Sequence, residues 1–313
     1  MEKRYEFAIL DPRNLPASIE ANDVVFDNPK GVYGIEITVS KLAARCVLNI
    51  DPQHTVGDVD KCAVEEALFV GLPEFGSTLA TVRADLDSVG SMAIFNFRAN
   101  GQVLGSGIMS RIKKIADFDK FSNGPYPGSR ELPSSSNLWP EGKTGLEALN
   151  EAILDFKMSI DDRVEVMQNW LLTGLVPQTY EDRVEVAREK MVAAIENGEI
   201  KIKPVSIDDN YKINLVIVES SHFFATTLGY MLAPVVVAVN TQFRQGLGEP
   251  YLKYTICTFR QEHADINSAL SELATLEPGW GGSPTIGGSP QGVSSVLDIE
   301  TVVGVIKRHI NRV

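Results

Sequence analysis

The chain has 313 residues, 44% of them hydrophobic and 22% charged, which is an ordinary composition for a globular protein with room for two domains. Its 29 basic and 41 acidic residues give a formal net charge of −12. This charge argues against a protein that binds long nucleic acid through the phosphate backbone, but it allows a small phosphorylated substrate. The three cysteines are scattered and no apolar stretch is long enough to span a bilayer, so we expect a cytoplasmic protein with reduced thiols and no membrane partner.

The first part of the chain alternates between strand and helix patterns. Residues 32–39, 44–50 and 77–84 are short and rich in β-branched side chains, as strands are. A helix-like apolar spacing separates the last two, and a second helix is predicted after Ala84, ending at Gly101. This alternation predicts an α/β fold: residues 1–145 form a domain with a mostly parallel sheet and flanking helices.

The middle of the chain changes character twice. Residues 122–145 are dense in Pro, Gly and Ser, which indicates a linker or surface excursion and leaves an active-site lid open. Residues 146–205 read as a helical connector between two domains. Ser159 with Asp162, and Thr179 with Asp182, have the spacing of capping boxes at two helix starts.

Strands return near residue 201, and residues 206–313 are predicted to form a smaller α/β domain with a mixed sheet. Strand-like runs cover residues 213–220, 233–243 and 252–259, and a terminal helix covers 298–310. A glycine-rich run lies between them at residues 279–292. It has no Gly-Lys-Ser/Thr and so is not a Walker P-loop, which leaves a flexible loop or an ordered ligand loop.

An acidic motif follows the strand at residues 77–84. Asp85 and Asp87 lie two residues apart, so in an extended backbone they share a face and could converge on one cation. The helix start that follows offers N–H groups to an anion. Two carboxylates beside such groups suit metal-assisted phosphate ester chemistry. The alternative is an ordinary strand-to-helix turn with an aspartate N-cap.

Two further acidic segments extend this motif. Asp51 ends another apolar strand and His54 follows it, a pair that suits Mn²⁺ better than Mg²⁺, although His54 alone could be an ordinary loop histidine. Asp117 and Asp119 repeat the two-residue spacing. We interpret the three segments together as a divalent metal site for Mn²⁺ or Mg²⁺. His222 is interpreted as a core or strand-end histidine, with a role as a compensating ligand left open.

The segment ADLDSVGS (residues 84–91) resembles the first motif of the DHH phosphoesterases, and NIDPQHT (residues 49–55) is similar to a degraded Asp-His-His motif. TICTFRQ, with Arg260, and Gly281-Gly282-Ser283 are similar to parts of the DHH-associated domain. The resemblance implies metals held by Asp and His in a cleft between two domains, with Arg260 and the glycine loop on the substrate's phosphate. Where the family has histidine, this chain has Arg83 and Ser283, and its first two motifs come in reversed order.

The resulting hypothesis is a metal-dependent phosphoesterase that hydrolyses a small phosphorylated or short nucleotide phosphodiester substrate. The alternative is a non-catalytic binding or assembly protein on the same scaffold, in which Arg83 pairs with Asp85 or Asp87 in place of the cation. The candidate residues are, for catalysis, Asp85, Asp87 and His54; for substrate binding, Arg83, Arg260, Gly281, Gly282 and Ser283; and for metal, Asp51, His54, Asp85, Asp87, Asp117 and Asp119.

Overall fold

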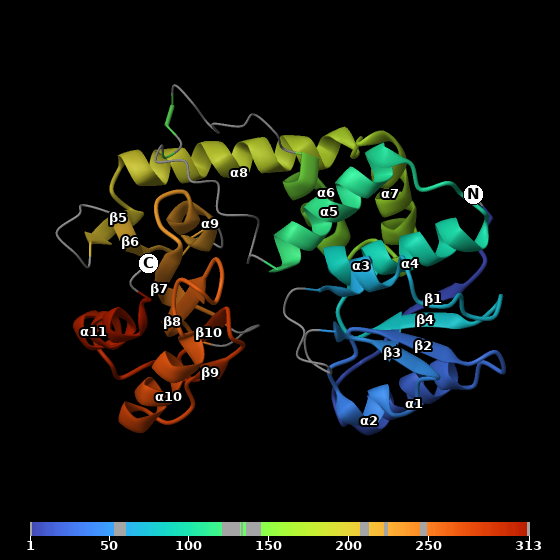
Figure 1. Cartoon of the computed structure of the whole chain (residues 1–313), viewed down its shortest axis with the longest axis horizontal. Helices are drawn as coiled ribbons and strands as arrows, with labels where there is room; N and C mark the ends of the chain where they lie inside the picture. The colour runs from blue at the N-terminus through green and yellow to red at the C-terminus, as the bar shows by residue number, and fades with distance from the viewer. Residues whose placement is uncertain are drawn as a thin grey trace. The chain divides into compact units, whose positions relative to one another are not determined.

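The computed structural model describes residues 2–52, 61–120, 132, 134–135, 145–206, 213–221, 225–244 and 249–311. The chain divides into two compact units, Met1–Lys120 with Lys143–Glu185, and Phe121–Gly142 with Val186–Val313. Each unit contains one sheet and its covering helices (Figure 1). The protein is therefore of the predicted α/β class, with a parallel sheet and a separate mixed sheet.

The first unit is built on a four-stranded sheet in which all neighbours pair parallel. Its strands are β1 (Glu6–Ile9), β2 (Val32–Ile35), β3 (Leu48–Ile50) and β4 (Thr78–Thr81), in the spatial order β1-β4-β2-β3. All four residues of β4 are buried, as expected for an inner parallel strand with helices on both faces. The four strands consequently end at one common edge of the sheet.

Helices cover both faces of this sheet (Figure 1). Two helices, α1 (Pro16–Phe26) and α2 (Ser40–Ala43), pack on one face through a small apolar cluster. The other face carries the main core, built from α3 (Ala63–Glu66), α4 (Leu86–Ala99), α5 (Ser106–Lys120), α6 (Gly145–Leu154) and α7 (Ile160–Thr173). Every residue of α4 from Leu86 to Phe97 is buried, so α4 is the central helix of this unit.

The second unit has a mixed six-stranded sheet in the order β5-β6-β7-β8-β10-β9. The strands are β5 (Lys201–Ser206), β6 (Ile213–Glu219), β7 (Val235–Phe243), β8 (Tyr251–Thr258), β9 (Gly281–Gly282) and β10 (Ile286–Gly288). Among these described strands, β6 and β7 pair parallel and the other neighbours pair antiparallel. The helix α9 (Ala225–Tyr230) packs on one face, and α10 (Ile266–Leu276) and α11 (Ile299–His309) pack on the other.

Along the chain, α8 (Gln178–Glu196) is the last helix before β5. Its residues belong to the first unit up to Glu185 and to the second from Val186. The predicted capping box at Ser159 is confirmed, because its hydroxyl accepts the Asp162 N–H at 3.1 Å. The one predicted at Thr179 is wrong, because α8 has already begun at Gln178.

In the described part of the chain, no helix is both long and apolar enough to cross a bilayer, and all three cysteines are free thiols.

All three strands predicted in the first unit are shorter than expected, and two of them have a local reason. The strand at 44–50 is reduced to β3 because residues 40–43 form α2 and the turn continues through Cys46, whose N–H donates to the Ala43 carbonyl. The strand at 32–39 ends at Ile35 because Glu36 has a φ of 52°, which is outside the extended region. The elements β1, α1 and α5 were not predicted.

Candidate metal centre

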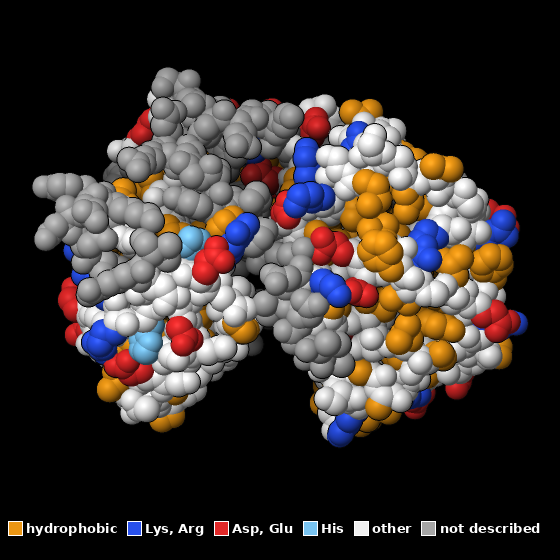
Figure 2. All heavy atoms as spheres, in the orientation of Figure 1, with side chains coloured by type: hydrophobic (Ala, Val, Ile, Leu, Met, Phe, Trp, Pro, Cys, Tyr) orange, Lys and Arg blue, Asp and Glu red, His pale blue; other side chains and the backbone are white. Residues whose placement is uncertain are grey.

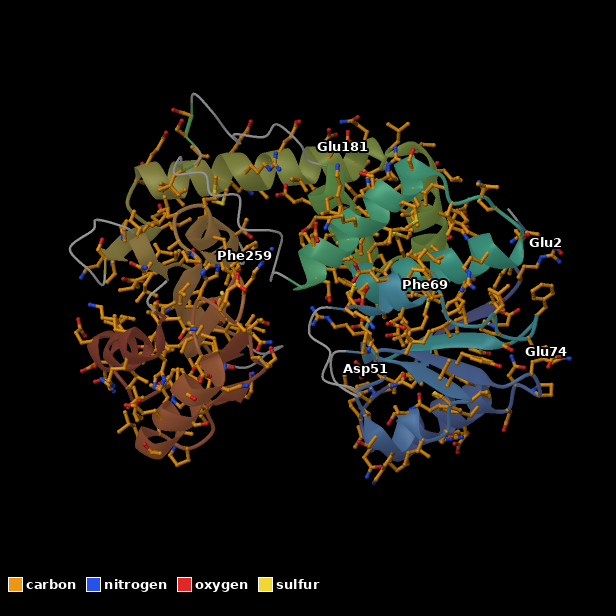
Figure 3. All side chains as sticks on the ribbon, viewed as in Figure 1. Glu2, Asp51, Phe69, Glu74, Glu181 and Phe259 are labelled. Atoms are coloured by element: carbon orange, nitrogen blue, oxygen red, sulfur yellow. The ribbon has the colours of Figure 1, made fainter. Side chains whose placement is uncertain are left out.

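Carboxylates follow all four parallel strands: Glu36 follows β2, Asp51 follows β3 and Asp85 comes after β4. The fourth, Asp11 after β1, is paired with Arg13. Strand register aligns the first two, because Ile35 pairs with Ile50 and the Glu36 N–H donates to the Ile50 carbonyl at 2.8 Å. Asp51 lies at the end of β3 and is buried (Figure 3). With Asp87 and Asp119, described below, Glu36, Asp51 and Asp85 form a group that we name the acidic edge.

Asp85 is the N-cap of α4. Its Oδ1 accepts the Ser88 N–H at 3.1 Å and the Ser88 hydroxyl at 2.9 Å, and the Ser88 side chain completes a capping box. Its Oδ2 lies 3.8 Å from Nε of Arg83, whose side chain is 77% exposed. An ion pair this long and this solvated compensates the carboxylate only weakly.

Asp87 sits in the first turn of α4 and is 1% exposed. Its Oδ2 accepts the Ala63 N–H at 2.8 Å and its Oδ1 accepts the Val64 N–H at 2.7 Å. These N–H groups open the short helix α3, so Asp87 ties two helices of the main core together. Each carboxylate oxygen has a second lone pair that these bonds leave open for a further donor or a cation.

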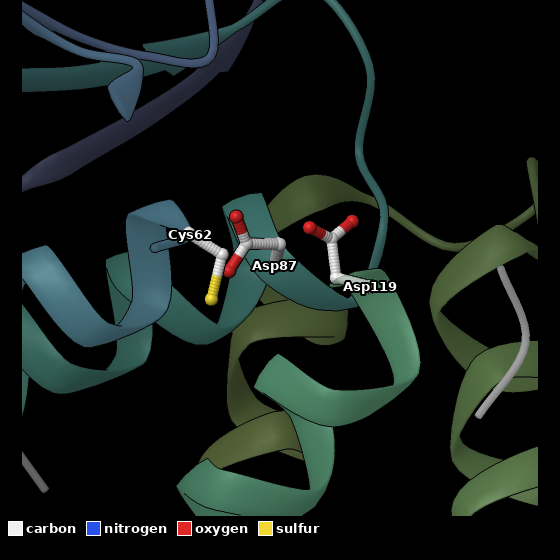
Figure 4. Close-up of side chains that lie close together, drawn as sticks. All are labelled: Cys62, Asp87 and Asp119. Atoms are coloured by element: carbon white, nitrogen blue, oxygen red, sulfur yellow. The ribbon is translucent and has the colours of Figure 1, made fainter. Parts of the chain in front are cut away.

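Asp87 lies close to two other side chains, Cys62 and Asp119, each from a different helix end (Figure 4). Cys62 precedes α3, and Asp119 comes from the last turn of α5. One ligand atom from each of Cys62, Asp87 and Asp119 lies within 4.8 Å of the others. The Cys62 thiol is buried and lies 3.4 Å from Oε2 of Glu65. A single ion could contact all three side chains.

The pKa values of the acidic edge show how its charges interact. Burial and then repulsion from Asp119 raise the pKa of Asp87 to about 8, against the opposing effect of the Val64 hydrogen bond. Burial raises the pKa of Glu36 well above its usual range, and the next largest causes are repulsions from Asp87, Asp85, Asp119 and Asp51. Four other carboxylates therefore lie close enough to Glu36 to repel its charge.

The buried, acidic surroundings also change the pKa of the Cys62 thiol. Burial, followed by repulsion from Asp87, raises the pKa of Cys62. Without a cation the thiol is therefore protonated at neutral pH, and only a bound metal would make it a thiolate ligand.

Glu36 was missed by the sequence analysis, which placed it in the middle of a strand. It is the one non-glycine residue with a positive φ among those described. Strained backbone of this kind persists where the surrounding structure enforces it, and it is enriched at functional sites. A signal was present: aligning the apolar runs that end at Ile35 and Ile50 places Glu36 level with Asp51.

The acidic edge fits a divalent cation. Its donors are carboxylate oxygens, which Mg²⁺ and Mn²⁺ prefer, and a cation would relieve the repulsions that raise the pKa values of Glu36 and Asp87. Cys62 adds a sulfur atom at the same place. A thiolate ligand would shift the preference toward softer ions such as Zn²⁺ or Fe²⁺.

The predicted metal ligands divide into three groups. Asp51, Asp85, Asp87 and Asp119 come together at the acidic edge. Asp117 instead pairs with Lys113 at 3.0 Å along α5, because side chains two residues apart on a helix point in different directions. His54 and His222 lie outside the described residues.

The predicted substrate residues of the second unit share one end of its sheet. Ser283 closes a hairpin turn between β9 and β10, its N–H donating to the Ile286 carbonyl at 2.7 Å. The Thr258 N–H donates to the Thr285 carbonyl at 2.8 Å, which places this turn beside the end of β8. Arg260 follows that end, exposed and 3.5 Å from Glu262.

Comparisons with known proteins add little to this geometry. No protein-family model matches the chain, and no curated protein matches it. A solved structure of the pGpG-specific phosphodiesterase PggH from Vibrio cholerae is similar over 98% of both chains, with 11% sequence identity and a TM-score of 0.43. At this level the similarity assigns neither a family nor an activity to this chain.

Proposed function

We propose that this protein is a divalent-metal-dependent phosphoesterase, a hydrolase of the DHH type, that acts on a small phosphorylated or short nucleotide phosphodiester substrate. The observation that supports it most is the convergence of Glu36, Asp51, Asp85, Asp87 and Asp119 at the carboxyl edge of the parallel sheet. This edge is where α/β proteins bind ligands. A site of this charge binds an anionic phosphate ester only once a cation has neutralised it.

In this proposal the acidic edge holds Mn²⁺ or Mg²⁺. When bound, the cation would polarise a phosphoryl oxygen and make a bound water more acidic. Asp87 is held by the Ala63 and Val64 N–H groups with one oxygen within 4.8 Å of ligand atoms of Cys62 and Asp119, and the capping bonds of Asp85 leave its Oδ2 open. His54 follows Asp51 in the sequence and is kept as a proposed ligand and catalytic group.

The substrate's phosphate would contact cationic and backbone groups. Arg83 is exposed beside Asp85, so its guanidinium is available to a phosphate oxygen next to the cation. In the second unit, Arg260 and the turn after Gly281 and Gly282 are kept as proposed phosphate-binding groups, because they share one end of the sheet. The three free cysteines are consistent with action in a reducing cytoplasm.

The proposal is tested by metal titration with a matched pair of variants. Asp119→Asn and Asp117→Asn change the same residue type on the same helix turn, but only Asp119 belongs to the acidic edge. We expect calorimetric titration of the chelator-treated protein with Mn²⁺ to show binding that Asp119→Asn weakens at least tenfold and Asp117→Asn leaves unchanged.

Hydrolysis is measured next, on a panel of phosphodiesters and pyrophosphate. Asp85→Asn and Asp87→Asn should each abolish the activity found in the wild type. Full activity in both variants would show that the acidic edge is not the catalytic site.

A non-catalytic binding protein is the second candidate, and two observations favour it. Arg83 does contact Asp85, although at 3.8 Å. The segment after α3 also exposes Phe69, Leu72 and Phe75, on a unit whose visible face carries several hydrophobic areas (Figure 2). If Arg83 replaces the cation, the wild type should bind no metal and Arg83→Ala should gain Mn²⁺ affinity. Unchanged metal binding in Arg83→Ala would count against this candidate.

A further inference from the structure

A buried lysine in the second unit has no acidic partner among the described residues. Lys253 lies on β8 and is 6% exposed, and its ammonium donates to the Ser289 carbonyl. Among the residues that the structure describes, no carboxylate lies within ion-pair distance of this ammonium, and burial lowers its pKa. The Lys253 ammonium has three N–H donors, and the Ser289 carbonyl accepts one of them. The other two have no acceptor among these residues.

The surface beside this ammonium is made of glycine. Gly288 pairs with Thr255 on one side and with Gly281 on the other, so these residues share the sheet face of Lys253. A methyl group on Gly288 would lie 3.5 Å from Nζ of Lys253 and would collide with the Tyr254 carbonyl oxygen. A methyl group on Gly281 would meet no atom within 4 Å. The space above Gly281 is therefore open to a ligand, next to the ammonium that borders Gly288.

The helices described in this unit cover other parts of the sheet. On the Lys253 face, α9 packs on β6 and β7. On the opposite face α10 covers β10, where a methyl group on Gly287 would collide with Leu270. We name the open area, formed by Lys253, Gly281, Gly288 and Ser289, the glycine floor.

We infer that the glycine floor is a binding site for a small oxyanion, specifically a phosphoryl group, with Lys253 as its cation. A buried ammonium without a counter-charge costs free energy, and a bound anion supplies that charge while accepting the two remaining N–H bonds. Glycines allow the anion to approach the backbone closely.

Gly281 is also among the residues proposed for the substrate, but Lys253, Gly288 and Ser289 are not. Lys253 lies five positions along β8 from Thr258, which is beside the turn and Arg260, and this spacing is about 17 Å of strand. The inference goes beyond the proposed function, since phosphoryl binding at the glycine floor requires neither metal nor hydrolysis.

The test is calorimetric titration of the full-length, chelator-treated protein with inorganic phosphate. We expect 1:1 binding that Lys253→Met weakens at least tenfold. Lys203→Met is the matched control, because Lys203 is an exposed lysine on β5 of the same sheet, and it should bind phosphate like the wild type. Asp85→Asn should also keep this binding, which separates it from a failure of the metal site.

A second variant guards against misfolding of Lys253→Met. Gly281→Val places its side chain in open space above the glycine floor, so it should weaken phosphate binding with an unchanged melting temperature. Wild-type affinity in both variants, or no phosphate binding by the wild type, would overturn the inference. Acetate binding as tight as phosphate binding would overturn the phosphoryl assignment.

Discussion

The two units place charge in opposite ways. The first collects five carboxylates at one edge of a parallel sheet, whereas the second buries the ammonium of Lys253 beside glycines on a mostly antiparallel sheet. Parallel strands all end at the same edge, so the residues that follow them converge, while antiparallel neighbours end at opposite edges. The comparison shows that sheet topology decides whether like charges accumulate or one charge is isolated. In each unit the sign of these charges predicts a ligand of the opposite sign: a cation at the acidic edge and an anion at the glycine floor.

The largest effect on stability is expected at Asp87. Replacing it with Ala leaves the buried N–H groups of Ala63 and Val64 without an acceptor, which should lower the unfolding free energy by about 3 kcal/mol. Denaturant unfolding of the metal-free protein measures this. The control is Asp117→Ala, whose surface ion pair with Lys113 should be worth less than about 0.5 kcal/mol. Equal losses in the two variants would contradict the role given to Asp87.

The acidic edge also predicts an unusual pH dependence. The pKa of Asp87 is about 8 in the folded protein and near 3.8 when unfolded. At pH values between the two, Asp87 is therefore protonated in the folded state and ionised in the unfolded state. Stability should therefore fall as pH rises from 4 to 8, by up to about 1.4 kcal/mol per pH unit near neutral pH.

Urea unfolding of the metal-free protein at several pH values measures this slope. Saturating Mn²⁺ should flatten it, because the cation favours the ionised carboxylates, and Asp87→Asn should reduce it without metal. A wild-type slope that Asp87→Asn leaves unchanged would assign the effect to other groups.

A smaller gain is expected at Glu36. Glu36→Gly removes one of the repelling charges and accommodates the φ of 52°, so the metal-free protein should be stabilised by about 1 kcal/mol. Glu36→Gln removes the charge alone and should recover part of that gain. Mn²⁺ affinity should fall in both variants, measured by titration. Loss of stability in both would mean that the Glu36 carboxylate makes a contact on which the fold depends.

The smallest effect is expected at Arg83. Its side chain is exposed and 3.8 Å from Asp85, so Arg83→Met should change the unfolding free energy by less than about 0.5 kcal/mol. Substrate affinity should still fall if the guanidinium contacts a phosphate. A large loss of stability would instead show that Arg83 compensates the acidic edge.

The sequence located much of this site because its signal is local. Asp51 and Asp85 each follow an apolar strand, and strands alternating with helices indicated a parallel sheet, so their convergence could be predicted. Glu36 was missed because the end of β2 depends on one backbone angle rather than on side-chain type. Asp117 and Asp119 looked equivalent until α5 was seen to be helical, where two-residue spacing separates them.

Composition and periodicity by themselves determined the α/β class, the parallel character of the first sheet and the acidic strand ends, because each depends on residues near one another in sequence. Only the tertiary structure decided that Asp87 accepts N–H groups from α3, that Cys62 lies beside Asp119, and that Lys253 is buried with no acid beside it in the described part of the chain. Those features depend on distances between residues far apart in the chain. The interaction between two charges is set by their separation and burial, which no spacing along the sequence encodes.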